Sequence, residues 1–187
     1  MWTAASCTGI NREGMNFFME GIRYASLEVR PRRIFARLLP GTDLIPGIKN
    51  ICDKHGIKAG AISTMLGSLR QVRFVWPIPD TVNKSRLKYG APKTLDGPIE
   101  LVSGTGVIGT MKDGGELAVH LHASFSDSTS KMWGGHIVDE GNPVAVTIEI
   151  VIDAYDDLSL ARNVDDETDM PLFNIVGQPV IHVDGKA

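Results

Sequence analysis

The chain has 187 residues, of which 43% are hydrophobic and 22% charged, and a formal net charge of −3 at pH 7. This length predicts one domain with room for a terminal extension. The acidic balance counts against general nucleic-acid binding, which needs a basic surface. No apolar run reaches the roughly 18 residues of a membrane span, and the first residues lack a secretory pattern. We therefore expect a cytoplasmic protein without a membrane partner.

The chain is divided into three parts. Residues 1–28 show no clean periodicity and form an N-terminal extension, 29–155 form the folded domain, and 156–187 form a C-terminal loop and an extended segment that packs on it. The domain opens with a strand, because Ile34 and Leu38 fall on one face of an alternating apolar run.

The next segment predicts the main helix. Thr42 or Asp43 offers an N-cap, and Gly56, directly after His55, offers a C-cap. Apolar residues recur between these caps at helical spacing, at Leu44, Ile48, Ile51 and Cys52.

After the helix the chain turns to strands. Alternating or β-branched runs predict them at 58–66, 70–76, 98–108, 116–125, 132–138 and 144–152. Residues 77–92 are expected to form a long loop, residues 154–170 an acidic loop, and residues 172–183 a segment that pairs at a sheet edge. The pattern predicts an α+β fold, with an antiparallel sheet of six to eight strands flanked by one main helix.

Three histidines carry the clearest chemical signal. His120 and His122 are two apart in a predicted strand, so both rings project from one face. The turn-rich segment 126–130 predicts a hairpin with the following strand. An even cross-strand register then brings His136 to the same face, whereas an odd register turns it away.

Three neutral imidazoles without a fourth protein ligand suit a divalent metal ion with one open coordination position. Zinc fits this pattern best, and nickel, iron and copper also accept imidazole. The alternative is three histidines that make ordinary hydrogen bonds on a half-exposed sheet.

Five motifs resemble one known family, the plant and prokaryote conserved (PPC) domain of plant AT-hook nuclear proteins and stand-alone bacterial proteins. They are G-I-K-A-G-A-I-S (56–63), G-S-L-R (67–70), G-P-I-E-L-V-S-G (97–104), H-L-H-A (120–123) and G-G-H (134–136). The resemblance covers roughly residues 30–155. It implies a sheet flanked by a helix, a homotrimer, and a metal, usually zinc, on the three histidines. The chain has no AT-hook. Its segment Arg30–Arg33 is only superficially similar to one and continues directly into a predicted strand.

Four further residues are candidates for a site around the metal. Glu100 is a candidate general base. Arg70, Arg86 and Tyr89 are candidates for binding an anionic group.

Two functions of different classes follow. The first is a metal-binding protein that binds a small anionic ligand. If this protein is an enzyme, the expected activity is that of a metal-dependent hydrolase or lyase. The alternative is a DNA-binding or transcription-related interaction module that acts through its trimer.

Overall fold

The computed structural model describes residues 22–179 and 181–183, which belong to two compact units. The smaller unit contains strands β1 (Ile22–Tyr24) and β12 (Ile181–Val183), which pair antiparallel. The predicted N-terminal extension lies largely outside the described residues.

The larger unit spans residues 26–178 and carries the remaining elements. They are β2 (Arg32–Leu38), α1 (Leu44–His55), β3 (Gly60–Val75), β4 (Pro77–Pro79), β5 (Leu87–Tyr89), β6 (Lys93–Met111), β7 (Leu117–Ser126), β8 (Met132–Ile137), β9 (Val144–Ala154), β10 (Leu160–Val164) and β11 (Pro171–Ile175). Among the described residues, no helix is long and apolar enough to cross a membrane.

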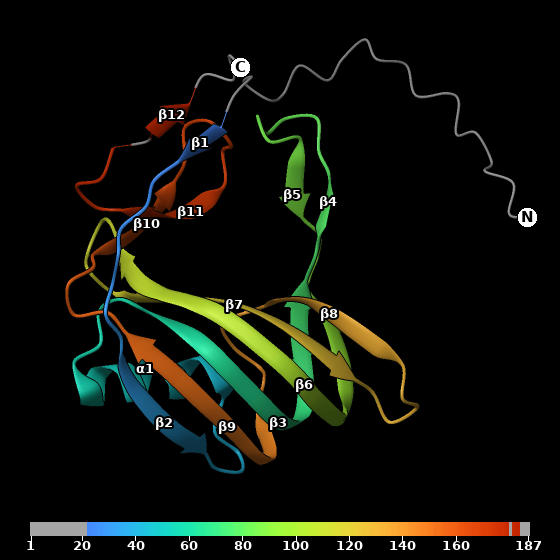
Figure 1. The fold of residues 1–187 in the computed structure, drawn as a ribbon. Helices are drawn as coiled ribbons and strands as arrows, with labels where there is room; N and C mark the ends of the chain where they lie inside the picture. The colour runs from blue at the N-terminus through green and yellow to red at the C-terminus, as the bar shows by residue number, and fades with distance from the viewer. Residues whose placement is uncertain (1–21, 180, 184–187) are drawn as a thin grey trace, which may run out of the picture. The chain divides into compact units, whose positions relative to one another are not determined.

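Eight strands form one sheet in the order β11-β10-β6-β7-β8-β3-β9-β2, and β3 also pairs with β6. Because β3, β6, β7 and β8 pair in a ring, this part of the sheet curls into a partly closed barrel (Figure 1). Neighbouring strands are antiparallel except β10 and β6, which run parallel. The predicted α+β architecture of one helix and an antiparallel sheet is confirmed, apart from this one pair.

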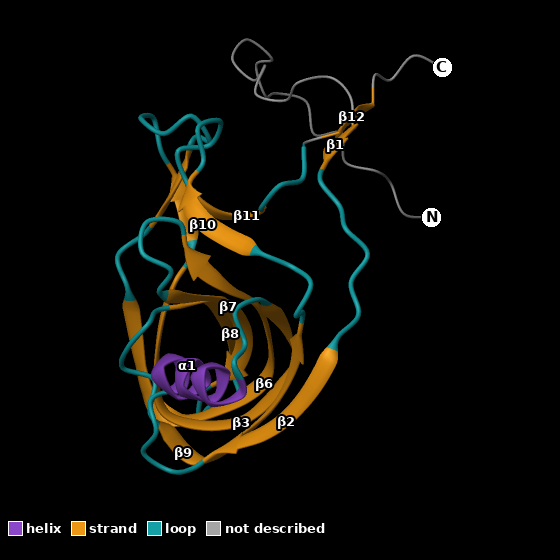
Figure 2. Ribbon diagram, turned by 90° about the vertical axis from the view of Figure 1, so that its left-hand side faces the viewer, coloured by secondary structure: helices purple, strands orange, loops and turns teal. Residues whose placement is uncertain are grey.

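Helix α1 lies in the hollow of the curved sheet (Figure 2). Leu44, Ile48 and Cys52 are fully buried at helical spacing, so the predicted apolar face is the one that packs inward. Gly56 ends the helix in the left-handed region at φ 66°, where glycine is favoured because it has no Cβ.

Asp43 is the N-cap residue, but its side chain does not cap the helix. Its carboxylate instead accepts hydrogen bonds from the backbone N–H groups of Gly141 (2.7 Å) and Asn142 (3.0 Å). The start of α1 is thereby tied to the loop before β9.

The structure corrects one strand prediction. The sequence predicts two strands, 58–66 and 70–76, but β3 is a single strand of 16 residues. Gly67, at φ 142°, lies where a Cβ would collide with the backbone carbonyl of Thr147. Glycine therefore lets the strand bend at this close approach instead of ending there.

Both loop predictions are also wrong in part. Residues 77–92 contain the β4–β5 hairpin, in which Pro77 pairs with Tyr89. Proline is tolerated there because a two-stranded ribbon leaves its outer edges unpaired. The acidic segment contains β10, which is held between β6 and β11. Polar composition alone does not reveal a strand whose partners come from elsewhere in the chain.

Candidate metal centre

Strands β7 and β8 form a hairpin whose turn is organised by Asp127. The Thr129 hydroxyl donates to one carboxylate oxygen (2.6 Å) and the Trp133 indole to the other (2.9 Å). These hydrogen bonds hold the pKa of Asp127 well below its ordinary value. The backbone N–H groups of Thr129 and Lys131 also donate to this carboxylate, so it fixes the turn and the register behind it.

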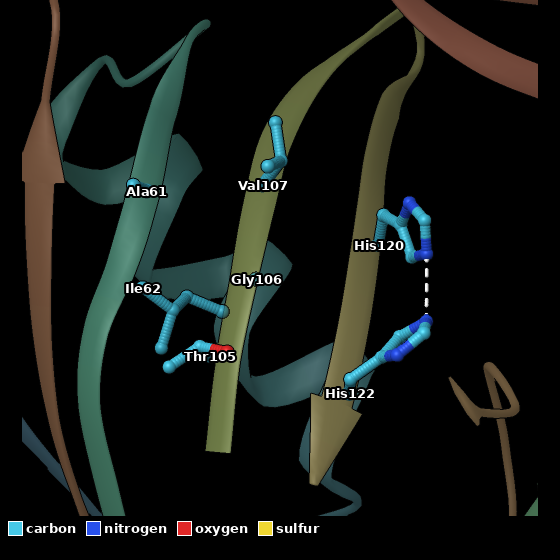
Figure 3. Close-up of a pocket in the computed structure, with 7 residues that line it drawn as sticks. All are labelled: Ala61, Ile62, Thr105, Gly106, Val107, His120 and His122. Carbon is cyan, nitrogen blue, oxygen red and sulfur yellow. Dashed lines mark hydrogen bonds between the residues drawn. The ribbon is translucent and has the colours of Figure 1, made fainter. Parts of the chain in front are cut away.

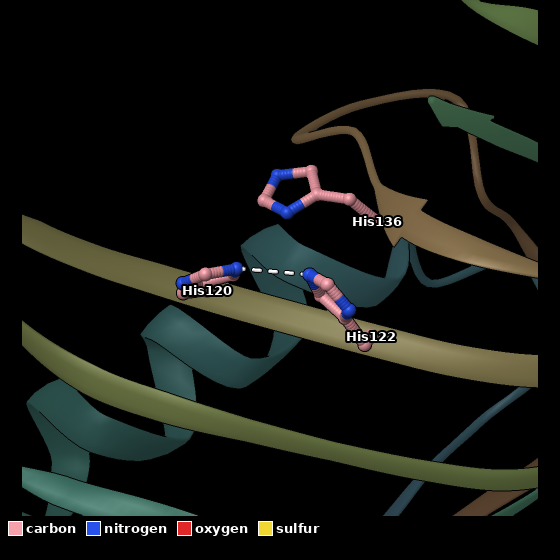
Figure 4. A group of neighbouring side chains, drawn as sticks. All are labelled: His120, His122 and His136. Atoms are coloured by element: carbon pink, nitrogen blue, oxygen red, sulfur yellow. Dashed lines mark hydrogen bonds between the residues drawn. The ribbon is translucent and has the colours of Figure 1, made fainter. Parts of the chain in front are cut away.

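In that register His122 pairs directly with His136. His120 lies two residues before His122 and shares its face. Figure 4 shows the three rings converging, with one ring nitrogen of His136 directed at the other two rings. The predicted convergence of the three imidazoles is confirmed.

The distances suit a metal ion. The Nε2 atoms of His120 and His122 are 3.0 Å apart, and the ligand nitrogens of all three histidines lie within 4.8 Å of one another. Nitrogens bound to zinc at about 2.0–2.1 Å are about 3.3 Å apart in a tetrahedron, so small ring rotations would close the set around an ion. No cysteine or carboxylate joins the three histidines as a candidate ligand in the described part of the chain.

Burial makes two of these rings, His120 and His136, poor bases. The Nδ1 atom of His136 is buried and has no hydrogen-bond partner. Burial, followed by the charges of His120 and His122, lowers the pKa of His136 to about 4. Burial also lowers the pKa of His120. Neutral imidazole is the form that binds metals, so an unpartnered neutral nitrogen beside two other rings fits a metal ligand.

A shallow groove of about 480 Å³ lies beside His120 and His122 (Figure 3). Small residues of β3 and β6, including Ala61, Thr105 and Gly106, form much of its lining. The two histidines are therefore reachable from solvent along the sheet.

Of the four further candidates, the structure brings Tyr89 to the histidines. Its ring centroid lies 5.0 Å from that of His136. The β4–β5 hairpin carries Tyr89 there, and Pro77, its cross-strand partner, lies two residues after Val75, the β3 partner of His136.

The other three candidates lie elsewhere. Glu100 is exposed and faces Ser126, whereas the β6 residue opposite His122 is Thr105. Arg86 donates to the Thr81 carbonyl (2.9 Å) inside its own hairpin loop.

Arg70 is also removed from the histidines. It is exposed and lies five residues before Val75, the β3 residue that pairs with His136. The position of Arg70 in the sequence does not reveal its distance from the histidines, because that distance depends on the curvature of the sheet.

Arg162 of β10 was not expected at this site. Its positive charge contributes to the lowered pKa values of His120 and His136, after burial and the neighbouring histidines. The sequence has no signal for it, because the surrounding segment is acidic and irregular.

The fold and the histidine cluster together define a mainly β protein with a candidate metal centre on a hairpin. The sequence profile of the Plants and Prokaryotes Conserved (PCC) domain, also written PPC, matches residues 28–156. The chain belongs to this family, as the five motifs predict.

Solved structures agree with this fold. A metal-containing protein from Archaeoglobus fulgidus is 24% identical with a TM-score of 0.65, covering 81% of this chain and 98% of its own. A plant- and prokaryote-conserved protein from Pyrococcus horikoshii is 24% identical with a TM-score of 0.63, covering 84% and 97%. A hypothetical protein from Salmonella is 25% identical with a TM-score of 0.64, covering 80% and 96%.

Curated relatives include a bifunctional protein GlmU from a Synechococcus strain, 27% identical over 159 residues. The match covers 82% of this chain but 22% of the relative, and in a second strain 17%. The chain thus spans about a fifth of the length of these relatives.

Proposed function

We propose that this protein binds a divalent metal ion, with zinc as the best match, at His120, His122 and His136, and that a small anionic ligand occupies the position these residues leave open. The observation that carries the proposal is the convergence of three imidazole nitrogens within 4.8 Å. The Archaeoglobus relative described as metal-containing has the same fold, which supports it.

The residues at the site would have different roles. The three histidines hold the ion in their neutral form, and Tyr89 covers one side of His136. A bound ion with an open position polarises a carbonyl or lowers the pKa of bound water. Hydrolase or lyase activity would need a base other than Glu100, which lies too far along β6.

Assembly as a homotrimer is part of the same proposal. Large apolar side chains are exposed on four strands of the sheet, with Phe35 69%, Val146 66%, Val102 51% and Leu66 44% exposed. Apolar exposure of this kind supports contacts between subunits. Light scattering coupled to size-exclusion chromatography should give three times the chain mass, and a monomer at all concentrations would contradict the trimer.

Elemental analysis tests the metal site. Protein purified without chelators or added metal should carry about one divalent ion per chain. His136→Ala should lose it and keep the circular dichroism spectrum of the parent. His55→Ala is the matched control, because His55 is an exposed residue at the end of α1. Equal metal content in the two variants would refute the site.

A further inference from the structure

The β10–β11 hairpin follows the region that matches the family profile, which ends at residue 156. It nevertheless packs closely on β6. The backbone N–H of Lys112 donates to the carbonyl of Arg162 (3.1 Å). A Cβ at Gly109 would lie 2.5 Å from the Phe173 ring, so glycine at this position of β6 makes room for the hairpin. The hairpin is thus an integral part of this end of the sheet.

This hairpin carries a cation, Arg162, that no carboxylate of the described residues pairs with. The Nε atom of Arg162 is buried and makes no hydrogen bond within the described part of the chain. The guanidinium carbon lies 5.7 Å from the centroid of the Phe173 ring, which holds the side chain on one side. An unmet buried donor on a charged group is costly, so an acceptor from outside the chain, either water or a ligand, is needed to satisfy it.

The charged groups near Arg162 do not supply that partner. Arg162 shares a cavity of about 220 Å³ with Lys49, Glu116 and Asp139. Glu116 lies 3.8 Å from the ammonium of Lys49. Asp139 is exposed, and among the described residues no ion pair joins it to Arg162.

Arg162 lies on the same face of the sheet as His120. It pairs with Met111 of β6. Val107, four residues before Met111 on that strand, pairs with His120, so strand alternation places both side chains on one face. The guanidinium and the imidazoles therefore share one electrostatic environment, to which a metal ion would add two further positive charges. A site with this charge favours an anion over a neutral ligand.

The β4–β5 and β10–β11 hairpins contact each other through their loops. The ammonium of Lys84, in the β4–β5 loop, lies 3.2 Å from the Asp169 carboxylate in the β10–β11 loop. The backbone N–H of Ser85 donates to the Thr168 carbonyl (3.1 Å). The hairpin that carries Tyr89 thus supports the hairpin that carries Arg162.

We propose that Arg162 is the oxyanion-binding residue of the histidine centre, so that the ligand class is a small molecule with a carboxylate or phosphate group. This inference rests on the proposed function. Guanidinium suits both oxyanions, because its N–H groups form a planar fork that matches two oxygens.

Cobalt-substituted protein tests the proposal, because its visible spectrum reports changes at the metal. We would titrate it with acetate and, separately, with inorganic phosphate, which distinguishes the two sources of the oxyanion. Arg162→Gln should weaken binding of the preferred anion by about ten- to a hundredfold, the effect of losing hydrogen bonds to a charged group. Arg162→Lys should lose less affinity for the anion, because lysine keeps the positive charge but lacks the planar fork of N–H groups.

Lys112→Gln is the matched control, since it removes an exposed charge from the turn residue after β6 whose backbone N–H donates to the Arg162 carbonyl. It should leave both affinities unchanged. Wild-type affinity for both anions in Arg162→Gln would overturn the proposal, and so would wild-type protein that binds cobalt but neither anion.

Failure of the proposed function is recognised separately, because wild-type protein would then take up no cobalt. In that case the same anions are titrated against metal-free protein, and the Nε–H resonance of Arg162 is followed by NMR. Movement of that resonance supports oxyanion binding by Arg162, and a fixed resonance refutes it.

Discussion

Tyr89 and His136 lie ring beside ring, with centroids 5.0 Å apart, although they belong to different hairpins. Tyr89 comes from β5, in a segment that is rich in proline and polar residues, and His136 from β8, which pairs with β7 and β3. The contact places a residue of the β4–β5 hairpin against the candidate metal centre.

Replacement of Tyr89 should raise the pKa of His136. Burial is the largest cause of its lowered pKa, and Tyr89→Ala would admit water to the ring. Tyr89→Phe keeps the ring and should leave the pKa near 4. NMR titration of the His136 ring protons in metal-free protein measures both variants, and equal pKa values in the two would contradict this role of the contact.

Two adjacent glycines should respond differently to alanine. A Cβ at Gly135 would lie 2.6 Å from the backbone carbonyl oxygen of Val75, whereas one at Gly134 would lie 3.1 Å from that of Ala123. Gly135→Ala must push β8 away from β3, and we expect a loss of about 1–3 kcal/mol in the free energy of unfolding. Urea denaturation measures it, and Gly134→Ala serves as the milder control. Equal losses would contradict the close approach of β8 to β3.

Metal-free protein should become less stable as the pH falls from about 6.5 to about 4. The pKa of His136 is about 4 in the folded chain and about 6.5 in an unfolded one. In this range the unfolded chain binds more protons, so acid favours unfolding. Urea denaturation at several pH values should show a smaller pH dependence in His136→Gln than in the parent. The same pH dependence in both proteins would show that His136 does not contribute.

Binding to random duplex DNA should be undetectable at physiological ionic strength. The net charge of −3 gives little general attraction to the phosphates of DNA, so counterion release would add little to the free energy of binding. A gel-shift assay at low and at physiological salt tests this. A shift that persists at physiological salt would favour the nucleic-acid function over the ligand-binding one.

Sequence periodicity located most of the fold. The apolar spacing of Leu44, Ile48 and Cys52 predicted α1, because only one face of a helix can pack against a sheet. The H-x-H pair predicted the shared face of His120 and His122, since strand alternation is a local property. The turn near Asp127 predicted the hairpin but left its register open, and the pairing of His122 with His136 in the structure decided that the third ring joins them.

Tertiary structure decided which other residues belong to the site. Tyr89 reaches His136 and Arg162 acts on the same histidines, whereas Glu100 and Arg70 remain at a distance along their strands. The closure of the β3–β6–β7–β8 ring and the parallel pairing of β10 with β6 set these positions. Pairings between segments far apart in the chain depend on long-range packing, which no local spacing of residues encodes.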